Sequence, residues 1–323
     1  MVKISLGSYT IRVKEKYQRK KNSENIEFEN LGSIGGEYDF VNFFSEFNST
    51  LIEEYKHIDR IDSILKFESI KKRGKRTFYG WVSAGKYGIS SDLVDIDSFD
   101  LSHPRSPDEV ELLPHFFLIE VPKDSKRGIL ILQRRGRRGI KTHFGNAIKK
   151  SFSNWKNGNF MIEIDRHVPN RALKKLTDGE IRKAELITYD IPSDKAEWER
   201  KVLSDRELES DRGQISISLS AKEGKRFALK EWMVDVMTGN KHLSEIKEEV
   251  GLNPQDRIRV TVDYGGTERT VELGDPRAIR PYVEVPREEV PLNDDNHPEK
   301  DKLTSYAFDL LDDLSEEVRT ERR

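Results

Sequence analysis

Cysteine is absent from the 323 residues. This absence excludes disulfide bonds, thiolate metal sites and cysteine nucleophiles, and it fits a reducing compartment such as the cytoplasm. Long apolar runs are also absent, because no window approaches 18 uncharged apolar residues, and we therefore expect no membrane insertion. At the N-terminus Val2, Ile4 and Leu6 alternate with polar or small residues, which predicts a strand and not the apolar segment of a secretory signal.

The motifs of the common catalytic and nucleotide-binding sites are missing too. The chain has no G-x-S-x-G elbow, no P-loop and no G-x-G-x-x-G string, and its seven histidines never stand four residues apart with an acid between them. The sequence therefore predicts no cofactor and no metal site, and it favours binding over catalysis.

Apolar residues recur regularly along most of the chain, which predicts a folded protein of mixed structure. Because 35% of the residues are apolar and 35% are charged, we expect two or three small domains under a charged surface. The predicted class is α+β, with mixed or antiparallel sheets and helices packed on one face. We expect an N-terminal α+β domain at residues 1–105 and a central α+β domain with a basic loop at residues 106–203. A C-terminal α+β domain at residues 204–290 and an acidic tail with a short helix at residues 291–323 follow.

Several segments have a clear period. Residues 40–64 place aromatic and aliphatic side chains three and four apart, which predicts a helix. Residues 76–89 alternate around glycines and predict a hairpin, whereas residues 97–114 are turn-rich and predict a connector. The apolar runs at 116–121 and 128–132 predict paired strands, and residues 140–155 predict a helix after them. Further strands are predicted at 160–164, 181–189, 215–219 and 282–285, a hairpin at 258–273 and a helix at 303–314.

The charge of the chain is unevenly distributed. The formal net charge is −2, but residues 123–150 contain ten Lys and Arg against one acid, which leaves 46 basic and 57 acidic residues elsewhere. Residues 284–323 contain 13 acids against six bases, and such a tail is usually solvated or docks on a basic surface.

Four arginines of the basic segment stand on one glycine-containing loop, Arg134-Arg135-Gly136-Arg137-Arg138-Gly139, between a predicted strand and a predicted helix. Guanidinium groups bind phosphates through two parallel hydrogen bonds, and the free amides at the start of a helix also attract anions. The loop therefore predicts a polyanion site. The candidate nucleic-acid-binding residues are Lys126, Arg127, Arg134, Arg135, Arg137, Arg138, Lys141, Lys149 and Lys150.

Other interpretations of this charge remain open. The loop can be solvated, or it can be neutralised by the acidic tail, which would make the tail an inhibitor of binding. An acidic partner subunit can dock on the same side chains without any nucleic acid. Two further basic runs, at 12–21 and 71–76, widen the footprint if they fold onto the same face.

A divergent nuclease is the catalytic alternative. Asp194, Glu199 and Lys201 form a D-x4-E-x-K string similar to the signature in which acids hold Mg²⁺ and a lysine supports the attacking water. That signature needs acids on adjacent strands, whereas this segment predicts one charged helix, so we expect solvated side chains here.

Two further patterns are weaker. Glu163, Asp165 and His167 contain metal-ligating groups, but a solvated strand end is the expectation because three residues in sequence define no geometry. The predicted helices at 226–237 and 243–250 have the spacing of a helix-turn-helix, but the second is too acidic to enter a major groove.

Four features of layout carry a resemblance to a known family. They are the predicted hairpin from Gly80 to Gly88, the polar stretch that leads to Pro114-His115-Phe116-Phe117, the glycine- and arginine-rich turn before a helix, and the late strand, hairpin and tail. Across residues 76–314 the chain resembles the phage-exclusion proteins of the lambda RexA type. The resemblance implies a DNA-binding sensor or effector of prophage exclusion or anti-phage defence that works with a partner protein, and it carries over no catalytic residue.

The function predicted from the sequence is therefore nucleic-acid binding in the cytoplasm, with DNA favoured over RNA. Contacts would go mainly to phosphates, so binding would be weakly sequence-specific and strongly salt-dependent. A protein partner or a homo-oligomer is also compatible with the sequence. The alternatives are an interaction subunit that docks an acidic partner and a divergent metal-dependent nuclease.

Overall fold

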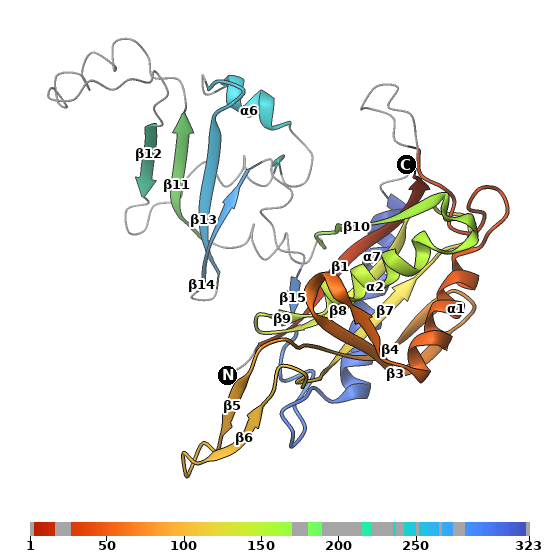
Figure 1. Ribbon diagram of the computed structural model, residues 1–323. Helices are drawn as coiled ribbons and strands as arrows, with labels where there is room; N and C mark the ends of the chain where they lie inside the picture. Colours follow the sequence, from red (N-terminus) through yellow and green to blue (C-terminus); the bar gives the residue numbers. More distant parts are fainter. Residues whose placement is uncertain are drawn as a thin grey trace, which may run out of the picture. The chain divides into compact units, whose positions relative to one another are not determined.

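A computed structural model of the chain shows an α+β protein built from antiparallel sheets and a few helices (Figure 1). The chain divides into two compact units, one formed by Met1–Pro169 with Pro281–Arg323 and one formed by Asn170–Arg280. The structure describes residues 3–16, 27–169, 180–188, 215–220, 235–236, 242–249, 252–264, 267–273 and 282–320.

The first unit is built on one long antiparallel sheet with the strand order β10-β1-β8-β7-β4-β3-β2. Two short strands extend the sheet. Strand β15 pairs with β1 beyond the end of β10, and β9 pairs with the end of β8. The strands are β1 Ile4–Glu15, β2 Lys56–Ile58, β3 Ser63–Arg73, β4 Thr77–Lys86, β7 Leu113–Glu120, β8 Gly128–Arg135, β9 Arg138–Gly139, β10 Phe160–Arg166 and β15 Tyr282–Glu284.

Both faces of this sheet are apolar, so the unit has two cores. In β7, Phe117 and Ile119 face one core, whereas Phe116 and Leu118 face the other, as the two-residue period of a strand requires. The first core is covered by the helices α1 Phe40–Glu53 and α2 Lys141–Ser153. The second is covered by the helix α7 Lys300–Thr320, which lies on the opposite face of the sheet (Figure 1).

The helix α7 corrects two expectations. The sequence predicted helices on one face only, and α1 and α2 do share a face, but α7 adds a third layer on the other side. The sequence also predicted a short helix in an acidic tail after residue 290. Leu303, Leu310 and Leu314 are instead buried against the sheet, so this segment belongs to the second core.

The domain boundary predicted at residue 105 falls inside the first unit. Strands β4 and β7 lie on either side of this boundary and pair with each other over eight positions, from Thr77 opposite Glu120 to Ala84 opposite Leu113. The boundaries between the two compact units instead lie after Pro169 and before Pro281. Pairing between distant strands, which local patterns do not encode, decides this division.

Two local predictions are wrong for a related reason. The helix predicted over 40–64 ends at Glu53, and the rest of that range includes β2 and the first two residues of β3. The hairpin predicted over 76–89 is one continuous strand, β4, whose partner β3 precedes it across a turn at Gly74 with φ of +65°. The predicted pair β7 and β8, the helix α2 and the strand β10 are confirmed.

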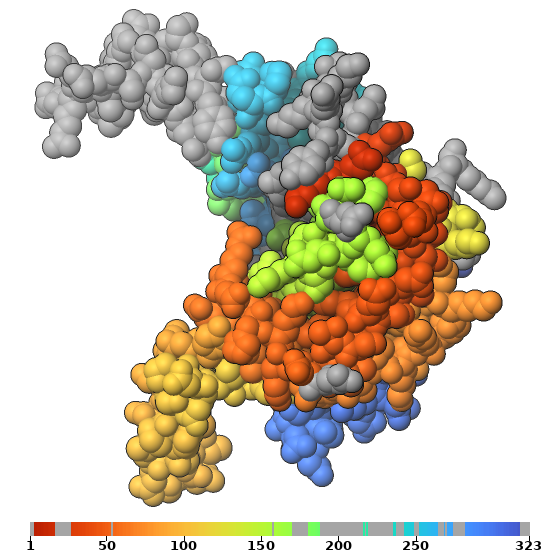
Figure 2. Space-filling model, turned by 45° about the vertical axis from the view of Figure 1, so that its right-hand side comes forward, coloured from red at the N-terminus to blue at the C-terminus, as the bar shows by residue number. Residues whose placement is uncertain are grey.

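A two-stranded arm projects from the first unit (Figures 1 and 2). It consists of β5 Ser91–Val94 and β6 Leu101–Arg105, which pair with each other and with no other strand of the described residues. The arm interrupts the connection between the paired strands β4 and β7, where a short hairpin loop would suffice. Its tip exposes Ile96 and Phe99, whose relative exposures are 85% and 80%.

The second unit contains a four-stranded antiparallel sheet with the order β12-β11-β13-β14. In its small core, Ile246 of the helix α6 packs against Ile258, Val260 and Val262 of the inner strand β13. The hairpin predicted over 258–273 is confirmed as β13 and β14. The elements are β11 Glu180–Thr188, β12 Ile215–Ser220, α6 Leu243–Glu249, β13 Arg257–Tyr264 and β14 Thr267–Glu272.

Within the described residues, no helix is both long enough and apolar enough to cross a membrane.

Candidate nucleic-acid interface

The arginine loop predicted from the sequence is a tight hairpin at one end of the long sheet. Arg135 pairs with Arg138, so Gly136 and Arg137 form a two-residue turn, and Gly136 has φ of +56°. Glycine suits this position because hairpin turns of two residues need positive φ, which other residues adopt at a cost. The amide of Gly136 also donates to the carbonyl of Lys3 at 2.8 Å, which fixes the turn against the start of β1.

The helix α2 begins directly behind this hairpin. Its N-cap is Ile140, no side chain caps the first turn, and no acidic residue stands in that turn. The amides and the helix dipole therefore present a positive end beside the arginines. We refer to Arg134, Arg135, Arg137, Arg138 and Lys141 together as the basic end.

Electrostatic crowding is evident at Lys141, the first residue of α2. Burial lowers the pKa of its amine, and the nearby charges of Lys149 and Arg166 lower this pKa further. An anion placed here would reverse the effect of these charges and stabilise the ammonium form. Asp165 and Tyr282 act in the opposite direction and raise this pKa, and burial and the two cations outweigh them.

Two side chains that the sequence did not indicate join the basic end. Arg166, at the end of β10, lies opposite Tyr9 of β1 and contributes positive charge to the same face of the sheet. Tyr282 of β15 lies under Arg134, whose guanidinium carbon is 4.7 Å from the ring centroid. No local pattern indicates these neighbours, because β1, β10 and β15 are far apart in sequence.

The tyrosines pack closely enough to constrain their surroundings. Tyr9 is buried and shares a hydrogen bond with Tyr282, and burial is the main cause that raises the pKa of its phenol. A Cβ atom at Gly7 would lie 2.7 Å from the ring of Tyr282, so a side chain there would displace that ring. The absence of a side chain at Gly7 thus leaves room for the Tyr282 ring, which contacts the guanidinium of Arg134.

Ion pairing leaves most of the hairpin charge available. Arg138 donates to Oε1 of Glu111 at 2.8 Å, and both side chains are largely exposed. Within the part of the chain that the structure describes, Arg134, Arg135 and Arg137 have no carboxylate within ion-pair distance. These three guanidinium groups are therefore free of carboxylate partners among the described residues, and the alternation along β8 directs Arg134 and Arg135 to opposite faces of the sheet.

The nine predicted residues do not form one surface. Lys126 and Arg127 precede β8, so they lie at its opposite end, about 25 Å from the hairpin at the rise of an extended strand. Lys149 and Lys150 stand near the end of α2, about 13 Å along the helix from Lys141. The predicted residues therefore fall into three groups, at the hairpin with the start of α2, before the start of β8, and near the end of α2.

Lys150 is also engaged within the fold, because its amine pairs with Asp59 at 3.1 Å. This pair is exposed on both sides, so it contributes little to stability and can exchange with another anion.

Of the two acidic patterns, the one with Glu163 and Asp165 lies among the described residues and is engaged in ion pairs. Glu163 and Asp165 face Arg12, which pairs with them at 3.7 Å and 2.7 Å, and Glu163 also pairs with Lys14. Among the described residues, no three acidic or histidine side chains come together to hold a metal ion. The string with Asp194, Glu199 and Lys201 lies outside the described residues, as does most of the first predicted helix of the helix-turn-helix pattern.

Comparison with known proteins adds no family to this description: no protein-family model matches the chain, and no curated protein matches its sequence.

Proposed function

We propose that the basic end binds the phosphate backbone of nucleic acid, with DNA as the favoured ligand, in the cytoplasm. The observation that carries the proposal is the convergence of arginines from the β8–β9 hairpin, Lys141 and an uncapped helix N-terminus at one end of the sheet. Arginine forks and helix amides both bind phosphate oxygens, and neither reads base identity. The preference for DNA, and a role in prophage exclusion or anti-phage defence with a partner protein, rest on the resemblance to phage-exclusion proteins.

The test is fluorescence anisotropy with labelled duplex DNA, single-stranded DNA and RNA over a salt series. The variant changes Arg134, Arg135, Arg137 and Arg138 to Ala. Each lost phosphate contact removes about 0.9 from the slope of log K against log salt, so four contacts should reduce the slope by about 3 to 4. We expect the wild type to bind with a steep salt dependence that this variant loses.

A charge-matched control separates a local site from general attraction. Changing Lys71, Lys75, Lys126 and Arg127 to Ala removes the same charge from the opposite end of the sheet. We expect this control to bind like the wild type apart from a small loss at low salt. If both variants lose binding equally, or if the wild type binds none of the three ligands at low salt, the proposal is wrong.

A protein ligand would give a different result. If the wild type binds no nucleic acid but binds an acidic peptide such as poly-glutamate through the same arginines, the basic end is a docking surface for an acidic partner. The pair between Arg138 and Glu111 shows that the hairpin accepts carboxylates in this geometry.

A further inference from the structure

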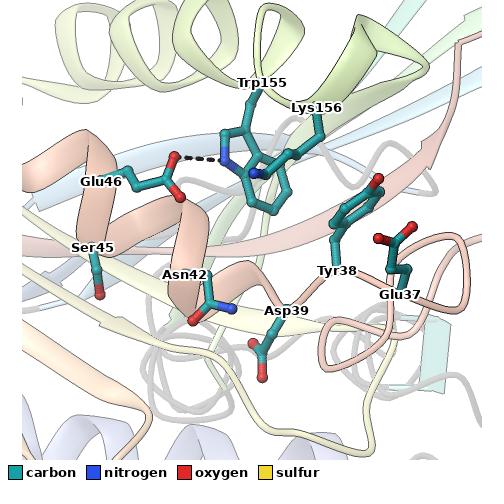
Figure 3. A pocket seen from close by; sticks show the side chains of 8 residues that line it. All are labelled: Glu37, Tyr38, Asp39, Asn42, Ser45, Glu46, Trp155 and Lys156. Atoms are coloured by element: carbon teal, nitrogen blue, oxygen red, sulfur yellow. Dashed lines mark hydrogen bonds between the residues drawn. The ribbon is translucent and has the colours of Figure 1, made fainter.

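A cavity of about 430 Å³ lies between the start of α1 and the chain that follows α2 (Figure 3). None of the residues at the basic end lines it. The lining residues come from the loop before α1, the first two turns of α1 and the end of the α2 segment: Glu37, Tyr38, Asp39, Asn42, Ser45, Glu46, Trp155 and Lys156.

Two aromatic rings form part of its wall. Trp155 contacts Tyr38 edge to face, with ring centroids 5.6 Å apart, and it packs against Phe43 at 5.4 Å. Phe43 is buried, whereas Tyr38 and Trp155 are only half-buried. The core therefore holds the indole rigidly and leaves aromatic surface open to a ligand.

The same wall carries an excess of negative charge. Glu37, Asp39 and Glu46 contribute three carboxylates, and the C-terminal end of α2 adds the negative pole of its helix dipole. Asp39 is neutralised by an ion pair with Arg76, which donates to both carboxylate oxygens at 2.8 Å and 2.9 Å, so the remaining negative charge comes from Glu37 and Glu46. Glu46 accepts the indole N–H of Trp155 at 2.9 Å, which places its carboxylate beside the ring (Figure 3).

The ammonium group of Lys156 is a cation of the protein itself that lines the cavity. The amine of Lys156 is 6.0 Å from the ring centroid of Trp155, at the outer limit of a cation–π contact. Its backbone has φ of +43°, a conformation that non-glycine residues rarely adopt. The contact is long, so the amine fills the aromatic face poorly and can be displaced.

We propose that this cavity binds an organic cation, an alkylammonium or guanidinium group, between the carboxylates and the rings of Tyr38 and Trp155. Aromatic faces attract such cations through the ring quadrupole, and nearby carboxylates add Coulomb attraction. Rings are poor ligands for metal ions, which take oxygen, nitrogen and sulfur donors, and the cavity is far larger than a bare ion. The group belongs either to a free polyamine or to a basic side chain of a partner protein.

The test follows the indole N–H resonances of the full chain by NMR during titration with spermidine, tetramethylammonium or arginine amide. The chain has four tryptophans, so Trp155→Phe identifies the Trp155 signal by its disappearance. We expect this signal to move in the wild type, with affinities in the millimolar range or tighter, and the other indole signals to stay in place. Stronger binding of spermidine indicates a polyamine, and stronger binding of arginine amide indicates a protein side chain.

Two exposed variants change the affinity in opposite directions. Glu46→Gln removes a carboxylate and should weaken binding about threefold to tenfold, whereas Lys156→Gln removes the competing cation and should tighten it about threefold. Glu288→Gln, an exposed carboxylate outside the cavity, is the matched control and should change nothing.

The proposal is overturned if no probe moves the Trp155 signal at about 10 mM, a concentration at which millimolar affinity is visible. It is also overturned if sodium chloride at matched ionic strength moves the signal equally, or if Glu46→Gln and Glu288→Gln bind alike. None of these outcomes depends on nucleic-acid binding by the basic end.

Discussion

His115 occupies an unusual position for an ionisable side chain. It lies in β7 with a relative exposure of 4%, and its Nδ1 atom lies 2.9 Å from the carbonyl of Leu113. Its Nε2 atom is buried and has no hydrogen-bond partner among the described residues. Burial is the main cause that lowers the pKa of His115 to about 4, and the neighbouring His143, Arg135 and His297 lower it further.

This histidine should make the stability of the first unit depend on pH. Above pH 6.5 it is neutral in both states, whereas between pH 6.5 and pH 4 the unfolded chain binds a proton that the folded chain excludes. Stability should therefore fall as the pH is lowered through this window, by about 2 kcal/mol between pH 7 and pH 5. Urea unfolding at pH 7, 6 and 5 measures the loss.

His115→Gln provides the comparison, because glutamine does not titrate. The variant can be less stable overall, but its free energy of unfolding should change less with pH than that of the wild type. Equal slopes for the two proteins would show that His115 does not carry the effect, and His143, whose pKa is lowered mainly by burial, would then be the next residue to replace.

Among the elements, α7 contributes much of the second core of the first unit. Leu310 is fully buried where the helix packs on the second face of the sheet. Leu310→Ala should destabilise the first unit by about 2 to 5 kcal/mol, because it removes apolar contacts and leaves a cavity. Lys302→Ala, on the exposed side of the same helix, should change the free energy of unfolding by less than about 0.5 kcal/mol.

Chemical denaturation monitored by circular dichroism compares the two variants. Similar stabilities for both would contradict the packing of α7 against the sheet, and they would favour the solvated tail that the sequence predicted.

Elements with strong local patterns were predictable from the sequence. Strands β7 and β8 are apolar runs joined by a short turn, and α2 has a regular apolar face. The pairing of β3 with β4 was missed because its turn at Gly74 lies in a charged run that has no hairpin signature. The arginine hairpin was found because its residues are contiguous, whereas Arg166 and Tyr282 reach the basic end only through strand pairing.

At the scale of the whole molecule, the way in which the second unit is inserted into the first determines whether the first unit can fold alone. Strands β10 and β15 lie on the same edge of β1, and the second unit is inserted between them. The amide of His167 donates to the carbonyl of Ser8, and Tyr282 pairs with Gly7, so the chain leaves and returns at neighbouring positions. The first unit therefore closes without the second.

Replacing residues 170–280 by a Gly/Ser linker of roughly eight residues should leave the first unit folded. We expect cooperative thermal unfolding, and we expect retained nucleic-acid binding if the basic end is the whole site. Anisotropy and calorimetry on the shortened chain check both points. Loss of cooperative unfolding would show that the second unit is needed for folding, whereas a folded chain without binding would place part of the interface in the second unit.

The projecting arm, combined with the absence of cysteine, gives this protein a convenient spectroscopic handle. Ile96 is 85% exposed at the tip of the arm, so Ile96→Cys introduces one accessible thiol into a chain that has no other. A single fluorophore or spin label attached there would report how the arm moves on the nanosecond scale. Paired with a dye on a bound oligonucleotide, the same label would measure how far the arm stands from the ligand.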